Sequence, residues 1–455
     1  MRSASVRRGN VIGSIAIASA ISLGLGISLV ILPLRVVLAL SGVGLWAALT
    51  FGVDPFLGML MLSVLMILRE LQVVYALEGL HLVRLAGIAT LVAWVVRGVV
   101  RRDLKLVSAP QNWLITLFFA IICFSRLDSG VVSGSLVVQS FAKVLIFYFL
   151  MINLIDSKDK LRVFLWLIVL AKSYLVLRAW RLYASGEVSV AIPYWWADKN
   201  GFAMGLVFFL PLIFALFWTE RAVWRRALLG SLACLYIVNI VRAHSRGGLL
   251  GLFVVLTLSL VHMFRSSRRR AELLIILAAL SIPFLRTLPQ ISGMVESIKG
   301  YKGDASAGLR LSAWRAGIQM IADNPVLGVG ADNFDDFFSA YSSAADRLSA
   351  HNVFIQVGAE TGLAGLLVFL GLMLLTLRDM RRLKTALKSS DHEMRDELND
   401  LLSFIAISLI GFFICGFFLL PAYGAGLYIL VGLVVILKRI AQANDILKGS
   451  DSESS

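Results

Sequence analysis

Long apolar runs alternate with short polar segments along almost the whole chain. A helix needs roughly 20 residues to cross about 30 Å of hydrocarbon, and runs of that order recur from Val11 nearly to the C-terminus. Stretches such as 249–264 and 401–420 are apolar on every face, whereas a barrel strand would alternate apolar and polar residues. The pattern predicts an all-α, polytopic bundle of transmembrane helices.

The runs define about 12 to 14 spans at the usual length of a membrane helix. The first run is followed by no small-residue cleavage pattern and no soluble domain, so we expect a retained anchor and not a signal peptide. The expected spans are 11–33, 36–53, 55–68, 82–97, 112–126, 136–155, 163–181, 202–218, 227–242, 249–264, 273–288, 351–377, 401–420 and 424–437.

Composition agrees with a protein whose solvent is lipid. The 455 residues are 59% hydrophobic and only 16% charged, where a soluble domain carries about 25% charged residues. The net charge of +15 does not indicate a nucleic-acid partner, because the basic residues are not gathered with aromatic residues on one soluble module. Cys123, Cys234 and Cys415 lie in apolar runs without CxxC spacing, so we expect core residues and no disulfide framework or zinc site.

The basic residues lie in short segments between the runs, which the positive-inside rule assigns to the cytoplasm. These clusters are Arg2–Arg8, Arg97–Lys105, Lys158–Arg162, Arg221–Arg226, Arg265–Arg270, Arg378–Lys388 and Lys438–Arg439. An even number of crossings must separate neighbouring clusters. This leaves four outer segments: residues 182–200, 243–248, 289–350 and the turn around Pro421.

The chain divides into N-terminal helices (1–155), central helices with two outer motifs (156–288), a large outer loop (289–350), C-terminal helices (351–440) and a cytoplasmic tail (441–455). The loop is long for a compact bundle, which points to function or to secondary structure of its own. Within it, Leu309, Trp314, Ile318 and Ile321 fall near helical spacing, and Asn324-Pro325 ends the pattern. We expect an amphipathic helix over 305–323, lying on the membrane surface.

The segment His244-Ser245-Arg246-Gly247-Gly248 is a polar break between two apolar runs. Arg246 therefore lies at the membrane boundary, where a guanidinium group usually has a partner such as a phosphate. The alternative is an arginine that extends to lipid headgroups. Arg310 and Arg315 on the predicted surface helix carry the same two interpretations, and for an arginine on such a helix alone the headgroup or solvent contact is the commoner one.

His351-Asn352 directly precedes a long apolar run. A lone histidine is more often structural than catalytic. At a helix N-terminus, however, the positive end of the macrodipole disfavours imidazolium and leaves a ring that can accept a proton. Exposed backbone N–H groups at the same terminus would suit an anion.

The loop also carries Asp332, Asp335, Asp336 and Asp346, so a metal-dependent transferase is an alternative. Asp332 belongs to the turn GVGADNF, and the other three fit a solvated face. GVG follows no strand, so it is not a dinucleotide fingerprint.

Several of these segments together resemble the bacterial O-antigen ligase and O-antigen polymerase superfamily. The matching segments are HNVFIQVGAETGLAGLL from His351, with Gly362 and Gly365 at the family's spacing, RLSAWRAGIQMIADNPVLGVGADNF at 310–334, HSRGGLLGL at 244–252 and, more weakly, Asp198-Lys199-Asn200. They cover roughly the C-terminal 260 residues in the family's order. The 189 residues before them match only in being hydrophobic.

The resemblance implies a glycosyltransferase-C-like fold in the bacterial inner membrane, with the active site facing the periplasm. It implies an inverting transferase that needs no metal or cofactor and moves a glycan from undecaprenyl diphosphate to an acceptor hydroxyl. His351 would be the base, and Arg246 and Arg310 would bind the diphosphate. Further residues expected near the site are Asp198, Asn200, Asn352, Arg178, Arg181 and Arg315.

The resemblance leaves the acceptor open. An O-antigen ligase would use lipid A core oligosaccharide, a polymerase would use a second carrier-linked repeat, and protein-glycosylating relatives are a third case. A transporter of lipid-linked glycans is the alternative from another class, but we find no paired internal repeat of the kind transporters show. Lys143 is the nearest residue to a buried charge that the sequence suggests, and it could also reach an interface.

Overall fold

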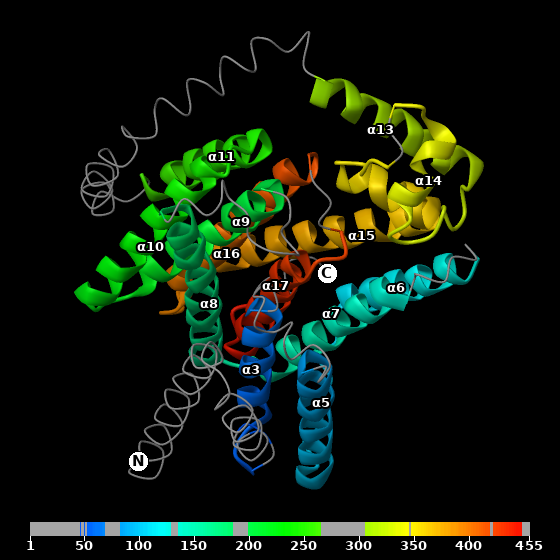
Figure 1. The fold of residues 1–455 in the computed structure, drawn as a ribbon. Helices are drawn as coiled ribbons and strands as arrows, with labels where there is room; N and C mark the ends of the chain where they lie inside the picture. Colours follow the sequence, from blue (N-terminus) through cyan, green and yellow to red (C-terminus); the bar gives the residue numbers. More distant parts are fainter. Residues whose placement is uncertain are drawn as a thin grey trace, which may run out of the picture. The chain divides into compact units, whose positions relative to one another are not determined.

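A computed structural model describes residues 46, 50, 52–68, 82–128, 135–184, 199–264, 305–344, 347–418 and 422–447. Every regular element in those residues is a helix (Figure 1). The helices are α3 (Pro55–Leu68), α5 (Leu82–Arg101), α6 (Pro110–Asp128), α7 (Ser135–Leu154), α8 (Lys158–Ala184), α9 (Lys199–Thr219), α10 (Val223–Arg242), α11 (Arg246–Met263), α13 (Ala305–Asp323), α14 (Phe334–Tyr341), α15 (Val353–Ser389), α16 (Arg395–Gly416) and α17 (Ala425–Ala443).

The predicted all-α membrane bundle is confirmed. Ten of the described helices are long and apolar enough to cross a membrane, and each coincides with one expected span. The shorter apolar helix α3 matches the span expected at 55–68. The expected spans 11–33 and 273–288, and most of 36–53, lie outside the described residues.

The chain forms two compact units, of which the first comprises residues 1–107, 146–179 and 192–195. In this unit α3 packs along α5. The inner face of α5 carries small residues such as Ala86, Gly87 and Ala93, while its exposed apolar side chains recur at helical spacing. These exposed residues are Leu85, Ile88, Val92, Val95, Val96, Val99 and Val100. Small residues inward and large apolar residues outward are the arrangement of a helix that packs on neighbours and faces lipid.

The second unit comprises residues 108–145, 180–191 and 196–455, and α9 is its central helix. Sixteen of the 21 residues of α9 are buried, which is typical of a helix enclosed on all sides. It packs against α10, α11 and α16.

Cys415 is buried as expected, whereas Cys123 and Cys234 are only half-buried.

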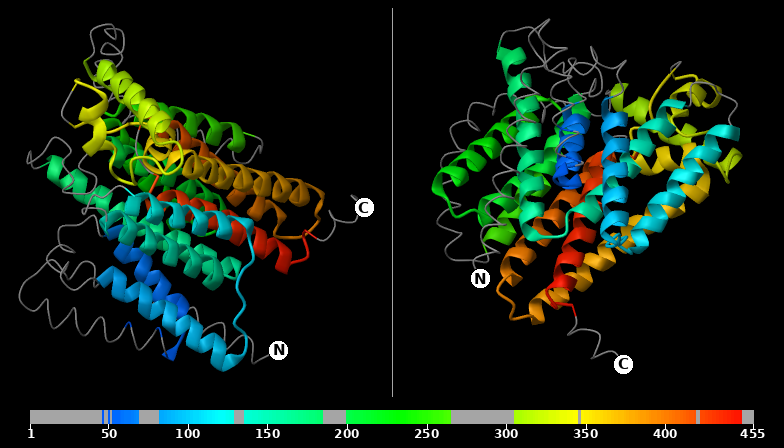
Figure 2. Two further views of the ribbon diagram at one scale, coloured as in Figure 1. Left: turned by 90° about the vertical axis from the view of Figure 1, so that its right-hand side faces the viewer. Right: turned by 90° about the horizontal axis from the view of Figure 1, so that it is seen from below.

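Helix α15, the longest described helix, contacts α6, α13, α14, α16 and α17 in the second unit. It packs along α6 and carries α13 and α14 on the end where it begins (Figure 1). Two further views show α13 and α14 at that same end of α15, with the turn into α16 at the other end (Figure 2).

Helix α13 confirms the helix predicted over 305–323, but its apolar stripe differs from the expected one. Ala313, Ala316 and Met320 are the residues that it buries, against α14 and α15. Trp314 and Ile321 pack beside this cluster, whereas Ile318 is 59% exposed. The helix therefore uses small residues to dock on protein. Its position on a membrane surface stays a prediction.

Candidate active site

His351 lies at the junction between the outer loop and α15. Asn352 is the N-cap of the helix, and its Oδ1 accepts hydrogen bonds from the N–H groups of Phe354 (3.0 Å) and Ile355 (3.2 Å). Asn352 thus satisfies two of the N–H groups that were expected to be open to an anion. His351, one residue earlier, is half-buried and has a φ of 47°. This left-handed conformation is uncommon outside glycine, although asparagine, aspartate and histidine adopt it more often than other residues, and it turns the chain sharply before the helix.

The segment before His351 is fixed to α14. Ser349 Oγ donates to Asp335 Oδ2 at 2.8 Å, and Arg347 pairs with Asp336. Ala350 is fully buried in the cluster between α13, α14 and α15. His351 is therefore held from both sides, by the α14 contacts before it and by the helix cap after it. Asp335 and Asp336, two of the carboxylates considered above as metal ligands, therefore bond to Ser349 and Arg347.

Arg246 is the first residue of α11, and Ser245 caps the helix. Ser245 Oγ accepts from the N–H of Gly248 (3.1 Å) and donates to Asn200 Oδ1 (2.7 Å). Asn200 lies in the first turn of α9, so this bond joins the two outer motifs. A cation at a helix N-terminus meets the positive end of the macrodipole, which is unfavourable. An anion bound in front of α11 would offset this repulsion, because it would attract both the Arg246 guanidinium group and the positive end of the macrodipole.

The glycines after Arg246 allow close packing of this helix end. A methyl group on Gly248 would lie 2.6 Å from Cβ of Ala203 in α9, and one on Gly247 would lie 3.1 Å from Cβ of Phe418. The Cys415 thiol also lies 3.7 Å from the carbonyl oxygen of Gly247. The start of α11 is thus packed between α9 and the C-terminal end of α16.

The start of α15 meets the same end of α16. A methyl group on Gly416 would lie 3.2 Å from Cγ1 of Val353, and the rings of Phe354 and Phe417 lie 5.3 Å apart. Gly247, which follows Arg246, and Val353, two residues after His351, therefore both contact residues 415–418. The structure brings these two predicted motifs to one end of α16.

Arg310 lies on α13, which packs along the start of α15. Gly317 packs on Ile355, and a methyl group on Gly358 would lie 2.8 Å from Cδ1 of Ile321, so α13 and the start of α15 run parallel. Arg310 lies two turns before Gly317, roughly 10 Å along the axis, toward the end of the pair where His351 lies. Ala313, one turn after Arg310, belongs to the same buried cluster as Ala350.

The other predicted residues are less closely connected. Arg315 is exposed on α13. Arg178 is half-buried and Arg181 exposed, both near the end of α8. Trp180, beside Arg181, is stacked by the Arg242 guanidinium group at 4.0 Å, two residues before the His244 motif. Asp198 lies outside the described residues.

Helix α15 is broken at Gly362, which has a φ of 67° and a ψ of −173°. Because of the break, the carbonyl groups of Ala359 and Glu360 lose the N–H donors that a regular helix would supply. N–H groups of the GVG turn in the outer loop take their place. Val329 N–H donates to Ala359 (2.8 Å), and Gly330 N–H donates to Glu360 (3.0 Å). The loop is thus hydrogen-bonded to the helix segment that begins next to His351.

A buried polar network that we did not predict surrounds this break. Glu360 is only 1% exposed, and its carboxylate accepts hydrogen bonds from Tyr423 Oη (2.6 Å), the N–H of Phe334 (3.3 Å) and Gln356 Nε2 (3.3 Å). Lys143, the expected buried charge, is only half-buried. A carboxylate inside an apolar run is itself a signal for a functional or structural role, and that signal was available at Glu360.

Arg126 of α6 extends the network to the loop. Its guanidinium group donates to the carbonyl oxygen of Ala331 (2.6 Å) and to Asn333 Oδ1. The Tyr423 hydroxyl has its pKa raised well above the usual value by burial and by the neighbouring Glu360 carboxylate, so it stays a donor. The loop, α6, α15 and the turn before α17 are therefore joined by one set of hydrogen bonds.

Asp332, another of the loop carboxylates considered above as metal ligands, has a φ of 63°. Its side chain reaches solvent, yet desolvation by surrounding atoms raises the pKa of Asp332, an effect that Arg126 opposes. Among the described residues, no three His, Cys, Asp or Glu side chains lie close enough to hold a metal ion. Asp346 lies outside that part of the chain.

We expect Gly362→Ala to destabilise the protein. A methyl group there would overlap the carbonyl group of Val326, and a positive φ costs a non-glycine residue of order 1–3 kcal/mol. Thermal unfolding of the purified protein in detergent should show a lower midpoint. Gly371→Ala in the same helix is the control, because its methyl group would lie 3.6 Å from Leu114 Cδ1 and alanine is a better helix former. Equal midpoints for both variants would contradict the role given to the break.

Comparison with known proteins gives one family match. The family model described as O-antigen ligase matches residues 231–370, a range that contains Arg246, Arg310 and His351. No curated protein matched the chain. The matched range includes α11, α13, α14 and the broken first part of α15. Over this range the chain is similar to the O-antigen ligase family, and its ten described apolar helices indicate a multi-pass membrane protein.

Proposed function

We propose that the protein is an inverting, metal-independent glycosyltransferase that moves a glycan from undecaprenyl diphosphate to a hydroxyl of lipid A core oligosaccharide. It would act as an O-antigen ligase of the bacterial inner membrane. The active site would face the periplasm, as the distribution of basic residues predicts. No cofactor takes part in this reaction.

The observation that carries the proposal is the contact of two motifs with one helix end. Gly247 and Val353, next to Arg246 and His351, both pack on residues 415–418, and the family match contains both motifs and Arg310. A base and cationic groups near one another are what glycan transfer from a diphosphate requires. Headgroup anchoring of Arg246 would not by itself explain why its motif packs on the same helix end as the motif of His351.

The chemistry assigns a role to each residue. His351 removes the proton from the acceptor hydroxyl as its oxygen attacks the anomeric carbon. The bond from that carbon to the diphosphate oxygen breaks on the opposite face of the sugar, which inverts the configuration. Arg246 and Arg310 stabilise the charge that develops on the leaving diphosphate, for which a planar guanidinium fork is well suited.

The helix geometry supports these roles. The macrodipole of α11 points its positive end at the position proposed for the diphosphate, beside Arg246. His351 precedes a capped helix end and is anchored on α14 through Ser349 and Ala350, so its backbone is held in place. Preorganised groups of this kind need little rearrangement during reaction.

A direct assay tests the acceptor. The purified protein receives one carrier-linked glycan as donor, with either lipid A core or a second carrier-linked repeat as acceptor. We expect a single glycan joined to lipid A core, resolved by size on a gel. A ladder of longer carrier-linked chains would instead identify a repeat-unit polymerase. Movement of the carrier-linked glycan across a vesicle membrane without any new glycosidic bond would identify a transporter and overturn the proposal.

A further inference from the structure

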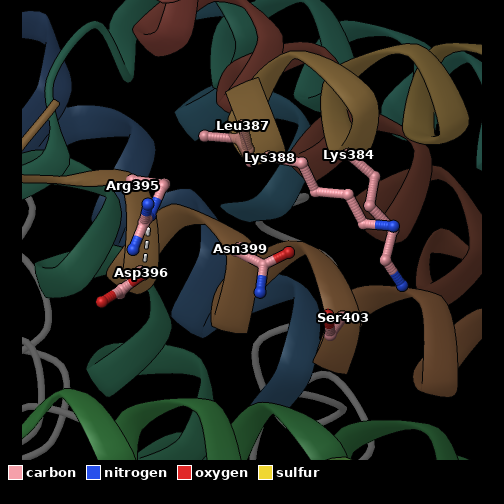
Figure 3. Close-up of a pocket in the computed structure, with 7 residues that line it drawn as sticks. All are labelled: Lys384, Leu387, Lys388, Arg395, Asp396, Asn399 and Ser403. Carbon is pink, nitrogen blue, oxygen red and sulfur yellow. Dashed lines mark hydrogen bonds and ion pairs between the residues drawn. The ribbon is translucent and has the colours of Figure 1, made fainter. Parts of the chain in front are cut away.

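A pocket of about 230 Å³ lies between the last turns of α15 and the first turns of α16 (Figure 3). Its lining residues are Lys384, Leu387, Lys388, Arg395, Asp396, Asn399 and Ser403. Lys384 and Lys388 are one turn apart on α15, and Arg395, Asn399 and Ser403 follow at the same spacing on α16. Residues at this spacing share one face of a helix, so each helix presents a polar stripe to the pocket.

The pocket carries an excess of positive charge. Arg395 Nε is 2.9 Å from Asp396 Oδ1, and the two side chains are 42% and 80% exposed, so this pair contributes little stability. Within the described residues, neither Lys384 nor Lys388 forms an ion pair with an acidic side chain. The nearest acid along α15, Asp379, is paired with Lys438 at 3.0 Å and accepts from Gln111 Nε2 at 3.0 Å. Within the part of the chain that the structure describes, no acidic side chain is therefore paired with either lysine.

Ser403 gives independent support for a ligand. Its side chain is 7% exposed, lines the pocket and has no hydrogen-bond partner among the described residues. A buried hydroxyl without a partner costs free energy, and a serine within a helix can avoid this cost by bonding to a carbonyl one turn earlier, a bond that Ser403 does not make. A ligand oxygen in the pocket would supply the missing partner.

The pocket lies at the opposite end of α15 from the candidate active site. Lys384 follows the break at Gly362 by a helical stretch of about 33 Å, which is close to the thickness of the hydrocarbon core of a bilayer. Both views in Figure 2 show the turn between α15 and α16 at the end of α15 that lies away from α13 and α14. The basic stretch from Arg378 to Lys388 assigns this end to the cytoplasmic boundary, where anionic headgroups lie.

We propose that this pocket binds a phosphate group. Lys384 and Lys388 would bind its oxygens by charge, and Asn399 and Ser403 would donate hydrogen bonds. A volume of about 230 Å³ admits a phosphate group with several waters, since a water occupies about 30 Å³. The phosphate can come from an anionic phospholipid or from a soluble anion. The site is separate from the transfer chemistry proposed above.

Two measurements on the purified full-length chain distinguish these sources. Native mass spectrometry measures phosphatidylglycerol retained from mixed phosphatidylglycerol and phosphatidylcholine nanodiscs. Thermal unfolding in pure phosphatidylcholine nanodiscs measures the effect of added inorganic phosphate. The test variants are Lys384→Gln with Lys388→Gln, and Ser403→Ala alone. The control is Arg381→Gln with Arg382→Gln, which removes the same charge from exposed positions of α15 that do not line the pocket.

We expect the lysine variant to weaken binding about 30-fold, since each lysine would lose a direct contact with the phosphate oxygens worth on the order of fivefold. Ser403→Ala should weaken it severalfold without altering the charge, and the arginine control should bind like the wild type. Retained phosphatidylglycerol identifies a lipid site, and stabilisation by inorganic phosphate alone identifies a soluble anion. Absence of both effects, or equal losses in the lysine and arginine variants, would overturn the proposal. Should the lysine variant fail to fold, wild-type binding by Ser403→Ala would overturn it as well.

Discussion

His351→Asn is expected to lower the rate of glycan transfer by about 10²- to 10⁴-fold, the usual contribution of a positioned general base. Asparagine is the appropriate substitute because it tolerates the left-handed conformation that His351 adopts, with a φ of 47°. An amide cannot accept the acceptor's proton, so chemistry is lost while the backbone is kept. The measurement is the initial rate of transfer from a carrier-linked glycan at saturating acceptor.

His244→Asn is the matched control. His244 has nearly the same backbone conformation, with a φ of 49°, and its side chain is exposed. We expect it to retain transfer activity and the thermal unfolding midpoint of the wild type. Wild-type rates for His351→Asn would remove the general-base role. Equal losses in both variants would show that the effect is not specific to the His351 ring and would also contradict the general-base role.

Arg246→Lys is expected to lower kcat/KM for the carrier-linked donor by roughly 10²- to 10³-fold, the typical cost of losing one donor to a developing oxyanion. The charge is preserved, so the loss would come from the planar fork, which an ammonium group cannot reproduce. Arg246 lies at the N-terminus of α11, where either cation has the same unfavourable interaction with the macrodipole. The substitution therefore changes the geometry of phosphate binding and little else.

Arg242→Lys is the control, because it shows whether any arginine-to-lysine change near the start of α11 lowers kcat/KM. Arg242 lies one turn before the Arg246 motif and stacks on Trp180, and a lysine can also interact with an aromatic ring. We expect its kcat/KM to stay within severalfold of the wild type. Donor kinetics unchanged in Arg246→Lys would contradict diphosphate binding by Arg246, even if His351 proved essential.

Much of the fold followed from local pattern. The helix predicted over 305–323 has the same bounds in α13, because apolar spacing and the Asn324-Pro325 stop both act within a few residues. The order of the spans was likewise readable from apolar runs. The buried face of α13 could not be predicted in this way. Burial at Ala313 and Ala316 depends on α14 and α15, and small residues give no strong apolar signal.

The candidate site was predictable only in part. Motif spacing identified His351, Arg246 and Arg310, but not the carboxylate of Glu360, whose partners Tyr423 and Phe334 are 63 and 26 residues away. The anion site expected at the N-terminus of α15 also changed, because Asn352 folds back on Phe354 and Ile355. Such a cap competes with any ligand for the same N–H groups.

By itself, then, the amino-acid sequence determined that this chain is a helical membrane protein, where most of its helices run and which motifs are the candidates for its active site. These properties depend on residues within one or two helical turns of each other. Only the tertiary structure decided which helix ends meet, how the break at Gly362 is filled by the GVG turn, and that Lys384 and Ser403 line one pocket. Those properties depend on side chains far apart in the chain, and packing alone brings them together.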